Sequence, residues 1–219
     1  MVSYEDIRSN PDIRVYISAA DRSLGALGYT EHSFAHVTQV AEGAARILTV
    51  LGYDAHTVEL ARIAGFLHDI GNLVNRIDHS QSGAIIAFRL LDKLGMPPAD
   101  IAEVVSAIGN HDEGTGTPVS PMAAALILAD KSDVRRSRVR NGDTLAFDIH
   151  DRVNYSVSSS ELAVSEADKT VSLLLAVNTE ISSVMDYFEI FLDRMILCKR
   201  AAEALGCRFI LNINGQQLL

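Results

Sequence analysis

The sequence predicts a mainly α protein, in which an all-helical domain over residues 1–140 precedes a small C-terminal α+β subdomain over residues 141–219. Two observations predict this division. Apolar residues recur at helical spacing between clear stop signals as far as residue 130, and short segments with strand character follow after residue 150. A chain of 219 residues is long enough for one substantial core and an appendage.

The helices of the first domain are delimited by capping residues, prolines and glycines. Asn10 and Pro11 mark a helix start, and Thr30 is expected to cap the next helix, which ends at Gly52. Further helices are predicted from Asp54 to Gly71, from Ser80 to Gly95, from Pro97 through Ile108, and from Ser120 through Asp130.

The C-terminal subdomain is expected to have the element order β-β-β-α-β. Its first strands are predicted over residues 153–157, 162–164 and 170–175, which are rich in β-branched and aliphatic residues between polar turns. A long amphipathic helix is predicted from about Thr179 to Leu205, and a last strand over residues 208–213.

Composition and charge exclude several classes of function. Hydrophobic residues make up 48% and charged residues 21%, as in ordinary soluble proteins. The net charge of −9 argues against a binder of duplex nucleic acid or of anionic membranes. The negative net charge does not exclude a phosphorylated small molecule as ligand, because a bound cation reverses the local electrostatic field. Without a signal peptide, a membrane span or a cysteine framework, a cytoplasmic protein is expected.

Histidines and aspartates in apolar helices are the residues that point to chemistry. A single histidine is more often a satisfied core or surface residue, so the interpretation depends on the set. His32 and His36 share one helix face, and His68 is followed directly by Asp69. Asp130 ends an apolar run, where a carboxylate needs a cation or strong hydrogen bonds. Nitrogen and carboxylate ligands together suit Fe, Mn, Zn or Ni.

The pattern of His36, the pair His68-Asp69 and Asp130 on successive helices resembles the HD-domain superfamily of metal-dependent phosphohydrolases. The stretches GFLHDIGN and LILADKSD around these residues carry the resemblance, which covers about residues 30 to 135. It implies an HD-like helical bundle in which these four residues bind one divalent metal ion.

His79 and His111 look like the extra histidines of the HD-GYP branch, which implies a second ion bridged by Asp69. One or two ions are therefore expected. The resemblance also implies catalytic roles for Asp69, which positions or bridges the ions, and for His32, which lines the site or binds a water. Two such ions clamp the attacking and leaving oxygens of a phosphoryl displacement.

The chain also departs from the HD-GYP pattern. Asn72 stands where that branch has a lysine, and the segment GTGTPVSP lacks the Gly-Tyr-Pro signature, so cyclic-dinucleotide hydrolysis is not expected. Because Asn72 cannot take a proton, Asp112 or Glu113 would be the general base, if a base other than metal-bound hydroxide is needed.

A basic cluster follows Asp130. Lys131 and Arg135 are four residues apart, and on one helix face they would hold a substrate phosphate beside the metal ions. The alternative is a solvated helix C-terminus, where cations complement the helix dipole. Arg138 and Arg140 are expected at the surface, and His56 and His150 are expected to be structural or solvent-facing.

The set of residues favours a phosphohydrolase that cleaves a phosphomonoester or phosphodiester of a small molecule or nucleotide by attack of metal-bound hydroxide. Two alternatives stay open. The same ligands, with His79 and His111, could build a diiron oxygenase. A non-catalytic module could instead sense a nucleotide, with the C-terminal subdomain binding a partner or forming a homodimer.

Overall fold

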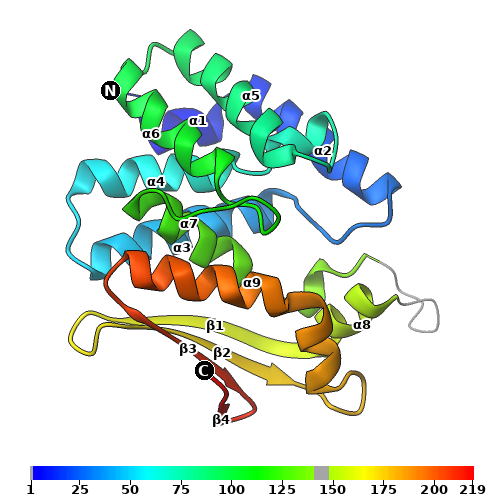
Figure 1. Cartoon of the computed structure of the whole chain (residues 1–219). Coiled ribbons are helices and arrows are strands. Elements are labelled where there is room, and N and C mark those ends of the chain that lie inside the picture. The colour runs from blue at the N-terminus through cyan, green and yellow to red at the C-terminus, as the bar shows by residue number, and fades with distance from the viewer. Residues whose placement is uncertain (1, 141–147) are drawn as a thin grey trace.

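The computed structural model describes residues 2–140 and 148–219 and places a helical bundle above a small sheet (Figure 1). The bundle contains α1 (Tyr4–Ser9), α2 (Pro11–Ala26), α3 (Phe34–Val50), α4 (Ala55–Leu67), α5 (His79–Lys93), α6 (Pro98–Gly109) and α7 (Pro121–Lys131). Two 3-10 turns, η1 (Ile70–Leu73) and η2 (Arg136–Arg138), lie in its loops. The C-terminal part contains α8 (Ile149–Ser156), β1 (Val157–Ser165), β2 (Thr170–Val177), α9 (Val184–Ala204), β3 (Arg208–Ile213) and β4 (Gln216–Gln217). This architecture confirms the predicted fold class.

Side-chain caps explain where most of these helices begin. The side chain of Asn10 accepts from two amides of α2, and that of Asp54 does the same for α4, as predicted. The cap of α3 is Ser33 rather than Thr30, because the Ser33 hydroxyl accepts from the amide of Ala35. The helix expected to run to Gly71 ends at Leu67, and a tighter 3-10 turn follows.

Helices α3, α4 and α7 form the centre of the bundle. Every residue of α7 from Met122 to Lys131 is buried, so this helix has no solvent-facing side. Where α3 and α4 cross, a Cβ on Gly65 would lie 2.6 Å from the Cα of Ala41. Only glycine therefore allows this close approach, which brings the start of α3 toward the end of α4.

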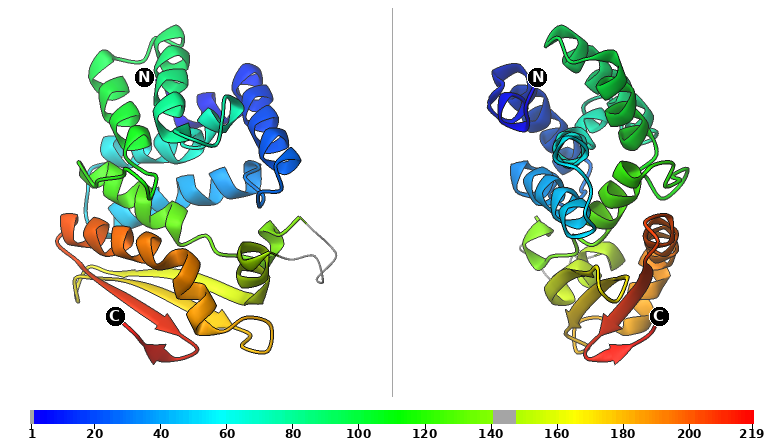
Figure 2. Two further views of the ribbon diagram at one scale, coloured as in Figure 1. Left: turned by 45° about the vertical axis from the view of Figure 1, so that its right-hand side comes forward. Right: turned by 90° about the vertical axis from the view of Figure 1, so that its left-hand side faces the viewer.

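The sheet has the strand order β1-β2-β3-β4. Strands β1 and β2 are antiparallel, β2 and β3 are parallel, and β4 is antiparallel to β3. Helix α9 connects the two parallel strands and lies between the sheet and α7 (Figures 1 and 2). The C-terminal helix therefore contacts the bundle as well as its own sheet.

The strand predicted over residues 153–157 is wrong, because residues 149–156 form helix α8. Asp148 caps this helix through the amide of Asp151. Ile149, Val153 and Ser156 are spaced as on one helix face, and Val153 and Ser156 are buried. The order from residue 148 onward is thus α-β-β-α-β-β. The boundary between residues 140 and 141 stays a prediction, because residues 141–147 lie outside the described residues.

None of the described helices combines the length and the apolar character that a membrane span requires.

Candidate metal centre

Six histidines and aspartates from five helix ends meet inside the bundle, and we call them the His/Asp cluster. His36 lies in the first turn of α3, and the pair His68-Asp69 follows α4. His79 begins α5, while His111 follows α6. Asp130 lies in the last turn of α7. All six side chains are buried. The sequence predicted these residues as ligands, and the fold brings all of them together.

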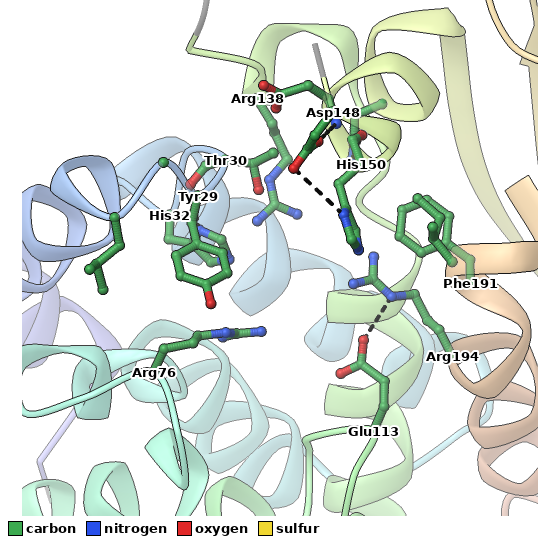
Figure 3. A pocket seen from close by; sticks show the side chains of 15 residues that line it. Tyr29, Thr30, His32, Arg76, Glu113, Arg138, Asp148, His150, Phe191 and Arg194 are labelled. Atoms are coloured by element: carbon green, nitrogen blue, oxygen red, sulfur yellow. Dashed lines mark hydrogen bonds and ion pairs between the residues drawn. The ribbon is translucent and has the colours of Figure 1, made fainter. Parts of the chain in front are cut away.

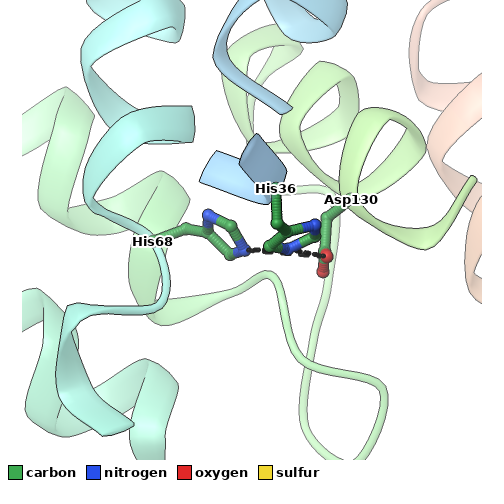
Figure 4. Close-up of side chains that lie close together, drawn as sticks. All are labelled: His36, His68 and Asp130. Atoms are coloured by element: carbon green, nitrogen blue, oxygen red, sulfur yellow. Dashed lines mark hydrogen bonds and ion pairs between the residues drawn. The ribbon is translucent and has the colours of Figure 1, made fainter. Parts of the chain in front are cut away.

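His36, His68 and Asp130 form one compact group of donor atoms (Figure 4). The Nε2 atoms of His36 and His68 are 3.3 Å apart. Asp130 Oδ1 lies 3.4 Å from His36 Nε2 and 3.6 Å from His68 Nε2. Ligand bonds of about 2.1 Å in a tetrahedral metal site give donor separations of about 3.4 Å. The spacing therefore fits a shared metal ion.

Asp69 joins this group to a second one. Its Oδ2 lies 3.2 Å from His68 Nε2 and 3.5 Å from His36 Nε2. Its Oδ1 lies 3.5 Å from His79 Nε2, and His79 Nε2 is 3.2 Å from His111 Nε2. His68, Asp69 and His111 also satisfy the spacing of a metal-binding group. One carboxylate thus faces both halves of the cluster.

Each histidine of the cluster uses Nδ1 for a hydrogen bond that leaves Nε2 as the inward-facing donor. His36 Nδ1 donates to Asp133 Oδ2 at 2.7 Å. The other acceptors are the carbonyls of Gly65 for His68 (2.8 Å), Arg76 for His79 (3.1 Å) and Ile108 for His111 (2.6 Å). Such bonds fix the tautomer and the ring orientation of a metal ligand. No local pattern in the sequence marks Asp133 as the partner of His36, although Asp133 lies only three residues after Asp130.

The buried donors fit a divalent cation. Asp69 Oδ2 is buried and has no hydrogen-bond partner among the described residues. Burial by itself would raise the pKa of the Asp69 carboxyl, but the histidines close to it, chiefly His68, hold it well below its usual range. A buried carboxylate facing several Nε2 atoms is a donor set that suits a first-row transition metal.

Asn72, which replaces the HD-GYP lysine, orients Asp69. Its Nδ2 donates to the carbonyl of Asp69 at 2.9 Å and to Asp69 Oδ1 at 3.0 Å. Asn72 is buried, so this amide holds the carboxylate that faces both halves of the cluster.

A chain of charged groups runs outward from Asp130, buried at Lys131 and half-buried at Glu113 and Arg194. Lys131 Nζ lies 2.6 Å from Asp130 Oδ2 and 2.7 Å from Glu113 Oε2. Glu113 Oε1 accepts from Arg194 Nε of α9 at 2.9 Å. Burial alone would raise the pKa of Glu113, but Lys131 and Arg194 hold it far below its usual range. Glu113 is therefore a poor general base, because a base needs a pKa near the working pH.

The predicted phosphate-binding pair has a different setting in the structure. Helix α7 ends at Lys131, so Arg135 lies outside it and the two do not share a helix face. Arg135 Nη2 donates to Asp133 Oδ2 at 3.0 Å. The role of Lys131 and Arg135 in binding phosphate stays a prediction. Arg138, expected at the surface, is buried and donates to the carbonyls of Glu31 and Asp133.

A cavity of about 500 Å³ borders the cluster (Figure 3). His32 lines it, and His32 Nε2 lies 4.0 Å from Asp69 Oδ2. Three arginines line the same cavity: Arg76, Arg138 and Arg194. No local pattern in the sequence marks Arg76 or Arg194 as residues of this cavity. His150, expected to be structural or solvent-facing, is largely exposed at the cavity wall.

Comparison with known proteins agrees with this geometry. The family model of the HD domain matches residues 33–136, the span that supplies all six residues of the cluster. Residues 33–136 of the chain are therefore similar to an HD domain. HD domains bind divalent metal ions, and the superfamily is one of metal-dependent phosphohydrolases. The match ends at residue 136, so it does not include α8, α9 or the sheet.

Two other proteins resemble this chain. An uncharacterized protein of Methanocaldococcus jannaschii, MJ1020, is 24% identical over 160 residues. That alignment covers 63% of this chain and 61% of the relative, so the chain spans less than two thirds of the relative's length. The crystal structure of a predicted HD superfamily hydrolase from an uncultured Thermotogales bacterium is 26% identical, with a TM-score of 0.43. It covers 60% of this chain and 73% of its own.

Proposed function

We propose that this protein is a metal-dependent phosphohydrolase that cleaves a phosphomonoester or phosphodiester of a small molecule or nucleotide. One observation carries the proposal: a buried His/Asp cluster with the spacing of metal ligands borders a cavity lined by three arginines. Guanidinium groups match the geometry and charge of phosphate oxygens. A metal site beside such a cavity suits phosphoryl transfer better than a reaction on an uncharged substrate.

The cluster assigns each residue a role. His36, His68 and Asp130 would hold one ion, while His79 and His111 would hold a second, with Asp69 shared between them. Bound divalent ions supply an activated water at neutral pH and neutralise charge on the phosphoryl oxygens. The metal is Fe, Mn, Zn or Ni, the ions that this mixed donor set accommodates.

His32 and Asp69 are the proposed catalytic residues. His32 Nδ1 bonds the carbonyl of Thr30 at 2.7 Å, so its Nε2 faces Asp69 with a free lone pair. Burial and the charge of Arg138 hold the pKa of His32 well below its usual range. The ring is therefore neutral, and its Nε2 can accept a hydrogen bond from a water beside Asp69.

The test is hydrolysis by protein purified without chelators and assayed with p-nitrophenyl phosphate and bis(p-nitrophenyl) phosphate, with Fe, Mn, Zn or Ni added. We expect phosphate-ester cleavage that falls more than about 100-fold in His68→Ala and Asp130→Ala, beyond the loss typical of residues around the ligands. His56→Ala is the matched control, because His56 pairs with Asp100 outside the cluster.

Two results would contradict the proposal. Activity that is equal in wild type and His68→Ala, with His68→Ala folded by circular dichroism, would remove the cluster from the reaction. Iron-loaded protein that consumes O2 but releases no product from any phosphate ester would instead support the diiron oxygenase.

A further inference from the structure

The cavity beside the His/Asp cluster gathers three arginines from segments that are far apart in the sequence. Arg76 precedes α5, Arg138 ends η2, and Arg194 lies in the middle of α9 (Figure 3). Arg194 comes from outside the span that matches the HD family, which ends at residue 136. The C-terminal subdomain therefore supplies part of the wall of this cavity.

Arg194 is held in a fixed orientation. Its Nε donates to Glu113, and its guanidinium carbon lies 4.3 Å from the ring centroid of Phe191. An aromatic ring and a carboxylate together restrict a guanidinium group, so little side-chain entropy remains to be lost on binding. Its Nη1 and Nη2 atoms make no hydrogen bond to any described residue. These two nitrogens are available as donors to a ligand in the cavity.

Arg76 and Arg138 are also restrained and also keep free donors. The guanidinium of Arg76 lies 5.8 Å from the ring of Tyr29, and its Nη1 is 3.3 Å from His79 Nε2. Arg138 Nε and Nη1 donate to backbone carbonyls, whereas its Nη2 has no partner in the part of the chain that the structure describes. Both groups thus border the cluster and present N–H groups beside it.

Two of the three arginines have a carboxylate partner: Arg194 pairs with Glu113, and Arg138 Nη1 lies 3.8 Å from Asp133 Oδ2. Arg76 has no carboxylate partner among the described residues. Glu113 is matched by both Lys131 and Arg194. Asp148 and Asp151, at the start of α8, also line the cavity, and Asp148 Oδ2 lies 3.9 Å from His150 Nδ1. Neither of these two aspartates pairs with an arginine of the cavity.

We infer that the substrate carries a second anionic group besides the phosphoryl group that is cleaved, and that Arg194 with Arg76 binds this second group. The inference rests on the proposed function. Metal ions at the cluster would neutralise the scissile phosphoryl group, so the free N–H donors of Arg194 and Arg76 are available to a different anionic group. A phosphate or a carboxylate offers the oxygens that a guanidinium fork binds. Substrates of this class are bisphosphates, diphosphate esters and phosphorylated carboxylic acids.

The test compares three aryl phosphates: phenyl phosphate, 4-carboxyphenyl phosphate and benzene-1,4-diyl bisphosphate. Each is assayed with metal-loaded wild type, Arg194→Gln, Arg76→Gln and Arg200→Gln. Arg200 is the matched control, because it is exposed on the same helix and outside the cavity. For each substrate the ratio of wild-type to variant kcat/KM cancels the intrinsic reactivity of the leaving group.

We expect Arg194→Gln and Arg76→Gln to lower kcat/KM for a substrate with a second anionic group more than for phenyl phosphate. The difference between the two losses should be at least about 10-fold, which corresponds to the free energy of one charge-assisted hydrogen bond. The 4-carboxyphenyl and bisphosphate arms distinguish a carboxylate from a phosphate. Arg200→Gln should change neither. An equal loss on all three substrates, or no loss in either variant, would overturn the inference.

A binding measurement separates this inference from the proposed function. Isothermal titration of the metal-loaded protein with benzene-1,4-diyl bisphosphonate and with phenylphosphonate requires no turnover. We expect the bisphosphonate to bind at least about 10-fold more tightly to wild type and to lose this advantage in Arg194→Gln. If no ester is hydrolysed but this pattern is seen, the phosphohydrolase proposal fails and the anion site stands. If hydrolysis is seen but wild type binds both ligands equally, the anion site fails alone.

Discussion

Asp133 Oδ2 accepts a 2.7 Å hydrogen bond from His36 Nδ1, and neither side chain is exposed to solvent. The two residues are 97 positions apart, at the start of α3 and just after α7. Gln39 and Arg135 also donate to the Asp133 carboxylate. Asp133 therefore fixes the ring of His36 and makes Nε2 the atom that faces Asp69 and Asp130. The cluster depends on this carboxylate although Asp133 is not one of its donors.

Asp133→Asn is expected to weaken metal binding about 10- to 100-fold, because an amide can turn its NH₂ group toward His36 and disturb the tautomer. Competition with a chromogenic chelator measures the affinity. Asp100→Asn is the matched control, since Asp100 accepts from His56 at 2.9 Å outside the cluster. Equal affinities in wild type and Asp133→Asn would show that His36 does not need this partner.

His111→Ala is expected to reduce the metal content from two ions per chain to one. His111 Nε2 belongs to the half of the cluster that contains His79, whereas His36, His68 and Asp130 form the other half. Elemental analysis of protein purified without chelators gives the content, and His56→Ala serves as the control. One ion per chain in both wild type and His111→Ala would leave a one-metal site.

The metal-free protein is expected to lose stability as the pH falls from about 5 to 3. Burial would raise the pKa values of Glu113 and Asp133 in the folded chain, but neighbouring groups lower both. Lys131 and Arg194 lower the pKa of Glu113. His36 and Arg138 lower the pKa of Asp133. A carboxyl group with a lowered folded pKa stabilises the fold above its unfolded pKa of about 4, and this contribution disappears as protons bind.

Urea unfolding at several pH values in the presence of a chelator measures this loss. Glu113→Gln should flatten the dependence and lower the free energy of unfolding above pH 5 by about 1.5 to 3 kcal/mol, since Lys131 and Arg194 each lose a charged hydrogen-bond partner. Glu203→Gln is the control, because Glu203 is exposed near the end of α9. Parallel pH curves for wild type and Glu113→Gln would contradict the assignment.

Gly71→Ala is expected to destabilise the fold and reduce metal binding together. A Cβ at residue 71 would lie 1.9 Å from the carbonyl oxygen of His79, so the start of α5 has to move. The expected loss is about 1 to 3 kcal/mol, as for overpacking in a core. In Gly109→Ala the nearest atom to the new Cβ is 3.7 Å away, and this control should keep wild-type stability. Unfolding and metal analysis of both variants test the difference.

Local chemistry in the sequence determined the helical fold class and the residues of the cluster. Caps such as Asn10 and Asp54 act within one turn, and histidines or aspartates in apolar helices signal a buried polar site wherever the helix lies. The same local signals failed at residues 153–157. Alternating residues there suit a strand, but the cap at Asp148 and the burial of Val153 favour a helix.

Only the tertiary structure decided what surrounds the cluster. Glu113 meets Arg194 across 81 positions, and His36 meets Asp133 across 97. No pattern within a helix or a turn encodes such pairs, because they form only when α9 packs against α7 and α7 packs against α3. The same packing places Lys131 between two carboxylates and brings three arginines to one cavity. The candidate metal ligands can be recognised from residue type in the sequence. The charged side chains next to them cannot, because they depend on which distant segments of the chain come into contact.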